Sequence, residues 1–175
     1  MGVVCPYFTL YNDNRMYKRQ KVYIETTLFN FYVDEDKGDA HAETVRLFKE
    51  IAANKYEAYT SDYVVDELER APEAKRDKMI SLLTEYGIKV LEPDTAASKL
   101  ADIYVAEGVI PLKYRTDGLH IAIATVNGLD MIISMNFQHI VKRKTVKMTG
   151  AINILNGYQA IEIYSPMEVV DSEIL

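Results

Sequence analysis

The feature that most constrains the fold is the stretch 115–140, RTDGLHIAIATVNGLDMIISMNFQHI, whose order indicates a helix, a turn, a strand and a second turn. Apolar residues within 119–126 recur at the i, i+3, i+4 and i+7 spacing of one helix face. Asn127 and Gly128 end this helix, and the apolar run 131–135 has the length of a strand buried on both faces. Strands buried in this way lie in parallel sheets, so the stretch predicts a protein of the α/β class.

The rest of the chain repeats the alternation of strand and helix. Further strand-like runs rich in β-branched and aromatic residues are expected at about 22–24, 57–61, 89–92 and 160–164. Helices are expected at about 28–33, 40–54, 62–70, 72–86, 94–107, 117–126 and 145–155. Strands separated by helices form βαβ units, so we expect a mainly parallel central sheet with helices on both sides.

The length of 175 residues is most economically a single domain. Residues 1–20 lack helical or strand periodicity, so we expect a flexible N-terminal arm followed by a domain at 21–175. An alternative is that the protein begins at Met16 and the preceding residues are upstream sequence. The chain has a single cysteine, Cys5, and no apolar run near the roughly 20 residues that span a bilayer, so we expect a cytoplasmic protein.

The charge pattern limits the class of nucleic-acid binder. A formal net charge of −6 argues against broad electrostatic coating of nucleic acid, but it does not exclude a nucleic-acid substrate. Basic residues gather at one place, where Lys142, Arg143, Lys144 and Lys147 follow the apolar strand. This cluster is either a solvated patch or a contact to RNA phosphate.

Four polar residues follow the predicted strands in a common pattern. Glu25 comes after the first strand, Glu67 lies on the helix after the second, and Asp117 precedes the apolar helix. Asn136 follows the next strand. Because ligands of open α/β sheets bind beyond the carboxyl ends of the strands, we expect these side chains to approach one another. Hard oxygen ligands of this kind suit Mg²⁺ or Mn²⁺.

With these residues the chain resembles the PIN-domain family of metal-dependent ribonucleases, and within it the VapC-like toxins of toxin–antitoxin pairs. The segments that carry the resemblance span most of residues 21–170: KVYIETTLFNFYVD, TSDYVVDELERAP, TDGLHIAIATVNGLDMIISMNFQHI and INILNGYQAIEIYSPMEVV. The resemblance implies a three-layer α/β/α sandwich whose acids hold Mg²⁺ or Mn²⁺ against an RNA phosphodiester. In such enzymes a metal-activated water attacks phosphorus in line.

The resemblance also implies roles for individual residues. Glu25, Glu67 and Asp117 match the metal-binding and catalytic acids, and Asn136 matches a catalytic position suited to orienting a water molecule. Thr27 matches the hydroxyl that follows the first acid and can bond a ligand or water, with Thr26 as the second choice. Glu25 departs from the family, which usually has aspartate at this position. The extra methylene of glutamate shifts the carboxylate by an amount comparable to displacements of catalytic groups that cost about 10²-fold in rate.

Each candidate has a purely structural alternative. Asp117 is also a helix N-terminal signature with its neighbours, Glu67 also fits a solvated helix face, and Asn136 also fits a turn. His120 is expected to be a hydrogen-bonded core residue more than a catalytic one. His139 is either an RNA contact or a surface histidine at a helix end.

The sequence and the resemblance together predict a Mg²⁺- or Mn²⁺-dependent endoribonuclease, the toxin of a type II toxin–antitoxin pair, which forms homodimers and pairs with an antitoxin encoded nearby. One alternative is a PIN-fold module that binds RNA or protein but has lost turnover through the altered Glu25. A second is a metal-dependent phosphatase acting on small phosphates. The sequence has no glycine-rich phosphate loop, so the α/β pattern does not indicate a site for NAD or ATP.

Overall fold

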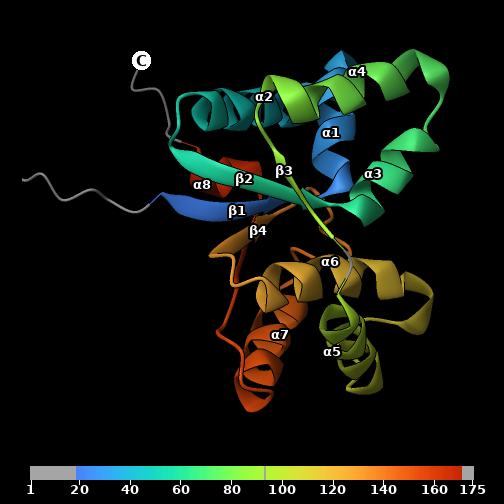
Figure 1. Cartoon of the computed structure of the whole chain (residues 1–175), viewed down its shortest axis with the longest axis vertical. Coiled ribbons are helices and arrows are strands. Elements are labelled where there is room, and N and C mark those ends of the chain that lie inside the picture. The colour runs from blue at the N-terminus through green and yellow to red at the C-terminus, as the bar shows by residue number, and fades with distance from the viewer. Residues whose placement is uncertain (1–18, 93, 171–175) are drawn as a thin grey trace, which may run out of the picture.

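A five-stranded sheet forms the centre of the protein (Figure 1). The computed structural model describes residues 19–92 and 94–170. The strands are β1 (Gln20–Ile24), β2 (Tyr56–Ser61), β3 (Lys89–Leu91), β4 (Met131–Ile133) and β5 (Glu162–Tyr164). They lie in the order β3-β2-β1-β4-β5, and every neighbouring pair is parallel. The mainly parallel sheet predicted from the sequence is therefore confirmed.

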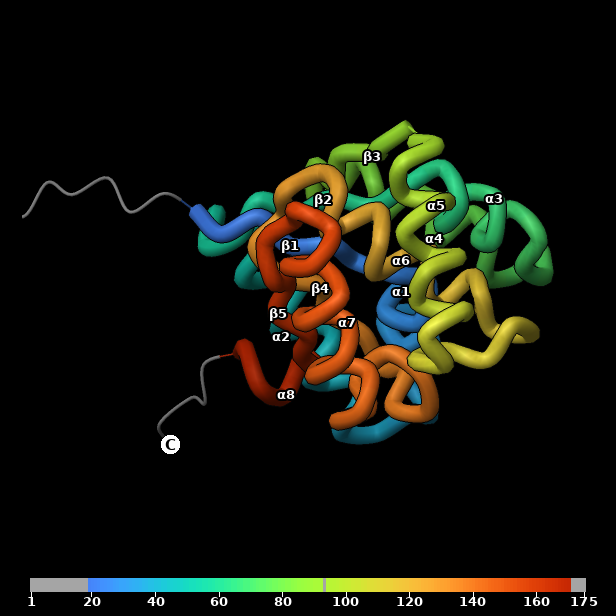
Figure 2. Tube along the Cα trace, turned by 90° about the horizontal axis from the view of Figure 1, so that it is seen from below, coloured from blue at the N-terminus to red at the C-terminus, as the bar shows by residue number. Residues whose placement is uncertain are grey.

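Helices cover both faces of this sheet (Figures 1 and 2). One layer contains α1 (Thr26–Val33), α2 (Asp39–Ala52), α3 (Asp62–Glu69) and α4 (Glu73–Glu85), and the other contains α5 (Thr95–Ala106), α6 (Arg115–Val126) and α7 (Arg143–Leu155). The short α8 (Pro166–Val169) packs against α2, and 3₁₀ turns lie at η1 (Glu35–Lys37) and η2 (Leu112–Tyr114). This arrangement is the expected three-layer α/β/α sandwich.

The order of the strands determines where a ligand site can form. The chain runs from β1 outward through β2 to β3, and then returns to place β4 on the other side of β1. The carboxyl ends of β1 and β4 therefore lie side by side, where the strand order reverses. Such a reversal is the usual position of the binding crevice in an open α/β sheet.

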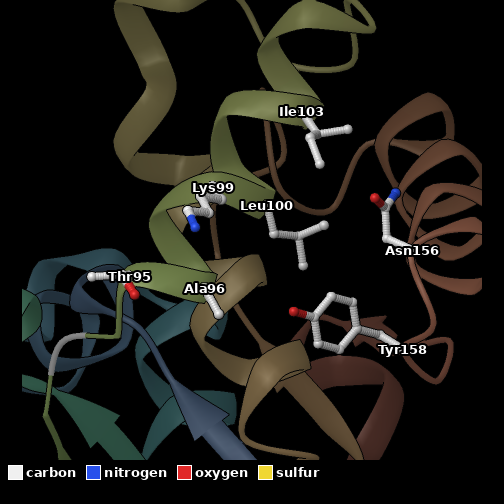
Figure 3. Close-up of a pocket in the computed structure, with 7 residues that line it drawn as sticks. All are labelled: Thr95, Ala96, Lys99, Leu100, Ile103, Asn156 and Tyr158. Atoms are coloured by element: carbon white, nitrogen blue, oxygen red, sulfur yellow. The ribbon is translucent and has the colours of Figure 1, made fainter.

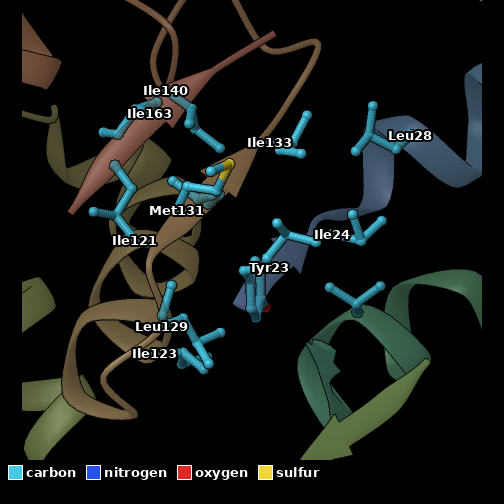
Figure 4. Close-up of a cluster of buried hydrophobic side chains, with 14 of the residues drawn as sticks. Tyr23, Ile24, Leu28, Ile121, Ile123, Leu129, Met131, Ile133, Ile140 and Ile163 are labelled. Carbon is cyan, nitrogen blue, oxygen red and sulfur yellow. The ribbon is translucent and has the colours of Figure 1, made fainter. Parts of the chain in front are cut away.

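The core surrounds β1, β4 and α6. Figure 4 shows side chains of β1 and β4 packed in one cluster with those of α6, α1 and β5. All three residues of β4 and all residues of α6 from Gly118 to Thr125 are buried. The sequence predicted a single apolar face for this helix, but α6 is enclosed on every side because it lies between the sheet and α5.

Most predicted elements are confirmed, but the start of α6 is wrong by two residues. The helix begins at Arg115 with Tyr114 at its N-cap, so Asp117 lies within the first turn. Gly118 does not mark the start of the helix. A Cβ atom at this position would lie 3.2 Å from Cδ1 of Ile110, so glycine permits the close approach of this segment to α6.

Other differences are smaller. β4 ends at Ile133 instead of residue 135, and Gln20, assigned to the arm, belongs to β1. α8 was not expected: Ser165 and Glu168 form a capping box ahead of it. Residues 1–18 of the predicted arm lie outside the described residues. No helix in the described part of the chain is both long and apolar enough to cross a membrane.

Candidate functional site

The predicted site residues lie at the carboxyl end of the sheet. Glu25 directly follows β1, and Asn136 lies three residues beyond the end of β4. Glu67 is on α3, which follows β2, and Asp117 is in the first turn of α6. The fold therefore brings all four residues to the region where β1 and β4 end side by side.

Glu25 is the N-cap residue of α1 and is only 2% exposed. Its Oε2 accepts the backbone N–H of Thr27 at 3.0 Å, and its Oε1 accepts the Thr27 hydroxyl. Burial raises the pKa of Glu25, although the bonds from Thr27, the electrostatic interaction with His120 and the Ser134 side chain partly offset that rise. The N–H and the hydroxyl of Thr27 therefore hold this buried carboxylate.

Thr27 connects Glu25 to the neighbouring strand. While its hydroxyl donates to Glu25, the same oxygen accepts the backbone N–H of Met135 at 3.0 Å. Met135 lies between β4 and Asn136, so this bond ties the turn after β4 to the start of α1. The threonine singled out by the sequence therefore fixes the two strand ends relative to each other.

Glu67 is held by groups from two other elements. Its Oε2 accepts the Thr26 hydroxyl and lies 3.6 Å from Nε2 of His120. That separation is longer than a hydrogen bond, so the contact with His120 is electrostatic. Burial raises the pKa of Glu67, but His120 and Thr26 outweigh it, and the pKa is lowered overall. Thr26, the second choice from the sequence, is thus the direct partner of Glu67.

Asp117 is half-buried beside other polar groups. Burial raises its pKa; the side chains of His120, His139 and Asn136 partly offset the rise, and the charge of Glu67 adds to it. Asp117 and Glu67 are therefore electrostatic neighbours of like charge. Since the N-cap position of α6 belongs to Tyr114, Asp117 does not occupy the capping position that was its structural alternative.

The side chains of Asn136 and His139 both interact with Asp117. The Asn136 Oδ1 accepts the backbone N–H of His139 at 3.1 Å, so Asn136 also has the structural role of fixing a turn. The His139 ring stacks on Tyr114 with 3.7 Å between ring centroids. Its Nε2 is buried and has no hydrogen-bond partner among the described residues. An orphaned buried nitrogen near Asp117 fits a site that receives a polar ligand.

The basic cluster surrounds the start of α7. Lys142 and Arg143 are exposed there, as is Lys147. The Lys144 ammonium donates to the Gly108 carbonyl oxygen at 2.7 Å, which ties α7 to the turn after α5. Lys144 therefore has a structural partner, whereas Lys142 and Arg143 are exposed and remain candidates for contact with an anion.

The oxygen ligands have the chemistry that a divalent ion prefers, but they do not converge on one point. Within residues 19–92 and 94–170, no group of three or more His, Cys, Asp or Glu side chains is placed to hold a metal ion. The contacts explain this: Glu25 is turned toward Thr27, and Glu67 toward Thr26 and His120. Mg²⁺ usually takes only one or two protein carboxylates and completes its shell with water, so the residues fit such an ion.

A cavity of about 370 Å³ lies elsewhere, between α5 and the C-terminal end of α7 (Figure 3). Its lining consists of Thr95, Ala96, Lys99, Leu100, Ile103, Asn156 and Tyr158. None of the candidate acids is among these residues. The cavity is therefore separate from the candidate site.

The sequence did not indicate that buried polar residues connect to the candidate acids through His120. Tyr23 and Ser61 are buried and bonded to each other, and Tyr23 also contacts His120. One signal was available: Tyr23 is two residues before Glu25, so the two side chains share a face of the extended chain. The prediction that His120 is a hydrogen-bonded core residue is confirmed, but its second nitrogen faces Glu67.

The fold, but not the sequence, is similar to that of known proteins. No protein-family model matches the sequence, and no curated protein matches it. Among solved structures, one similar chain belongs to the VapBC2 complex from Rickettsia felis, which is bound to a DNA fragment from its promoter. The TM-score is 0.53 and the sequence identity 7%, and the match covers 83% of this chain and 98% of that chain. A chain of DNA-bound VapBC from Salmonella typhimurium gives a TM-score of 0.51 and 13% identity over 84% of this chain and 98% of that one. The expected likeness to VapC-like PIN domains is therefore confirmed as a likeness of fold.

Proposed function

We propose that this PIN-like chain is a Mg²⁺- or Mn²⁺-dependent endoribonuclease that hydrolyses RNA phosphodiester bonds, and that it is the toxin of a type II toxin–antitoxin pair. The observation that carries the proposal is the pair of like-charged carboxylates, Glu67 and Asp117, at the same end of the sheet as the buried Glu25. Burial, with a smaller contribution from the charge of Glu67, raises the pKa of Asp117, so the folded protein disfavours the negative charge on this group. A divalent cation would remove that disadvantage.

The carboxylates of Asp117, Glu67 and Glu25 are the groups that would hold the ion. When bound, a divalent ion supplies a Lewis acid that activates water and stabilises charge on the phosphate oxygens. The chain itself fixes the direction of its ligands. Asn136 interacts with the Asp117 carboxylate, and Thr26 bonds that of Glu67. Thr27 holds Glu25 while it joins the ends of β1 and β4.

The test is cleavage of single-stranded RNA by the purified protein in a titration with Mn²⁺ or Mg²⁺. We expect cleavage that rises with metal, disappears in EDTA and returns when excess metal is added. The same ions should raise the melting temperature, since a ligand at 100 times its Kd stabilises the native state by about 2.7 kcal/mol. Cleavage that persists in EDTA would contradict the proposal.

The exposed basic residues at the start of α7 are expected to hold the RNA backbone. Lys142→Ala and Arg143→Ala should each weaken RNA binding, and the loss of affinity should be about the same for every RNA sequence. Each should also reduce the magnitude of the slope of log Kd against log salt concentration by about 1. The matched control is Lys49→Ala, which removes an exposed lysine from α2, on the opposite face of the sheet. An unchanged salt dependence in both α7 variants would show that the cluster is a solvated patch.

The proposed partners are an antitoxin encoded nearby and a second copy of the chain. The solved relatives are VapBC complexes, and this supports the proposal of a protein partner. Co-purification with the product of the adjacent reading frame, followed by light scattering, tests both partners. A protein that remains a monomer alone and binds no neighbouring product would contradict this part of the proposal.

A second candidate function is a PIN-fold binding module without turnover. The observation in its favour is that the Glu25 carboxylate already has the Thr27 N–H and hydroxyl as partners. The described acids also do not surround a single point. Substitution of Glu25 by aspartate distinguishes the two functions.

A further inference from the structure

A chain of buried polar groups runs beneath Glu67. The Ser61 hydroxyl, at the end of β2, lies 2.7 Å from the Tyr23 hydroxyl of β1. The Tyr23 hydroxyl lies 3.0 Å from Nδ1 of His120 on α6, and Nε2 of His120 faces Oε2 of Glu67 at 3.6 Å. Ser61 and Tyr23 are fully buried, and His120 is 3% exposed. Four elements therefore meet through one line of polar contacts.

The direction of these hydrogen bonds follows from the two ends of the line. The assignment concerns the neutral form of His120, which carries one ring proton, and an ionised carboxylate only accepts. If the proton were on Nδ1, the lone pair of Nε2 would face the negative charge of Glu67. With the proton on Nε2, Nδ1 accepts from Tyr23. Tyr23 has one proton to give, so Ser61 must donate to the Tyr23 oxygen.

Two further observations agree with this direction. Tyr23 is fully buried, where a phenolate charge would be costly, so its hydroxyl keeps the proton that it donates. At the other end, Thr26 and His120 both address Oε2 of Glu67, and neither contact involves Oε1. Both contacts therefore hold the same carboxylate oxygen of Glu67.

We propose that the line Ser61–Tyr23–His120 fixes the Nε2–H tautomer of His120 and thereby orients the Glu67 carboxylate. His120 is then a positioning residue, because it acts through its contact with Glu67. Successive hydrogen bonds polarise one another in a low dielectric, which strengthens the N–H dipole aimed at Glu67. The consequence for catalysis rests on the proposed nuclease function, but the tautomer does not.

The tautomer can be measured directly by the ¹⁵N chemical shifts and long-range couplings of the His120 ring. We expect a proton on Nε2 and a bare Nδ1 in the wild-type protein, and loss of this preference in Tyr23→Phe. A wild-type protein with its proton on Nδ1 would overturn the inference, whether or not the protein cleaves RNA.

Two substitutions of His120 test the roles of its two ring nitrogens separately. Gln at this position keeps an amide near Nε2, toward Glu67, and Asn keeps one near Nδ1, toward Tyr23. The readouts are Mn²⁺ affinity by calorimetry and RNA cleavage, with circular dichroism to check the fold. Loss of an outer-shell partner costs about 10–100-fold in metal affinity or activity. We expect such losses in His120→Asn and Tyr23→Phe, and a substantially smaller loss in His120→Gln.

The matched control is Tyr104→Phe. It also deletes one buried hydroxyl, which donates to Asn153 away from the acids, and it should retain wild-type affinity. Equal losses in the Tyr23 and Tyr104 variants, or in the Gln and Asn variants, would show a general effect on the core and overturn the positioning role. A wild-type protein that binds Mn²⁺ but cleaves no RNA would refute the proposed nuclease and leave the tautomer measurement valid.

Discussion

Asp117→Asn is expected to reduce metal-dependent RNA cleavage by at least about 10²–10³-fold, the usual cost of removing one preorganised electrostatic group from an active site. The amide has nearly the shape of the carboxylate, so it should keep the packing of α6. It lacks the negative charge, however, and binds a hard divalent ion much more weakly. The measurement is the initial rate of single-stranded RNA cleavage in saturating Mn²⁺, together with calorimetry of Mn²⁺ binding.

The same substitution should stabilise the metal-free protein. Because burial raises the pKa of Asp117, the folded state binds a proton more tightly than the unfolded state. Stability therefore falls as pH rises from the ordinary carboxyl pKa through the raised one, and the loss is complete above it. Asp117→Asn removes that loss. Its melting temperature in EDTA should exceed that of the wild type by more at pH 7.5 than at pH 4.

Asp102→Asn is the matched control for both effects. Asp102 is on α5 and bonds Arg115 at 2.6 Å, and this guanidinium lowers its pKa. Its charge therefore favours folding above the ordinary carboxyl pKa, so the Asn variant should not gain stability at neutral pH. It should also cleave RNA normally. If Asp117→Asn shows no greater stabilisation at pH 7.5 than at pH 4, the assigned environment of Asp117 is wrong.

Substitutions of Glu25 are expected to have the second large effect on RNA cleavage. Two of them test separately the charge of the carboxylate and its position. Glu25→Gln removes the charge and should lower cleavage by about 10²-fold or more. Glu25→Asp keeps the charge and remains a good N-cap for α1, so the fold should be retained. The shorter side chain withdraws the carboxylate by about the length of one carbon–carbon bond, and displacements of about 1 Å can cost roughly 10²-fold in rate. We therefore expect a folded but slow Asp variant.

Glu69→Gln and Glu69→Asp provide the control, since Glu69 is exposed on α3. Both should retain wild-type cleavage rates. A strong gain of activity in Glu25→Asp would mean that the glutamate holds the site in an inactive form, and the binding module without turnover would become the better account.

The strands and helices were predictable because their signals are local. The apolar run of β4 predicts a strand buried in a parallel sheet, and Asp94 caps α5 through the N–H of Ala96 as its position suggests. The strand order follows less directly from these signals. Nevertheless, any parallel arrangement places the residues that follow the strands at the same end of the sheet, so the shared location of Glu25 and Asn136 was predictable.

The supporting contacts were not predictable, because they depend on how separate elements pack. Nothing local to Thr26 indicates that its hydroxyl binds Glu67, 41 residues away along the chain. The contact of Tyr23 with His120 similarly joins β1 to α6. The start of α6 was misplaced for a related reason. Gly118 resembles a helix-start residue in sequence, but the packing of Ile110 against α6 explains it.

The most direct test of the account is the chemistry of the RNA ends produced by the wild-type protein and by Asp117→Asn in Mn²⁺. If water is the nucleophile, the 2′-hydroxyl does not attack, and the wild-type products carry no 2′,3′-cyclic phosphate. We expect such linear products from the wild type in Mn²⁺, and essentially none from Asp117→Asn or in EDTA. Cyclic phosphate ends, or equal cleavage by both proteins, would contradict it.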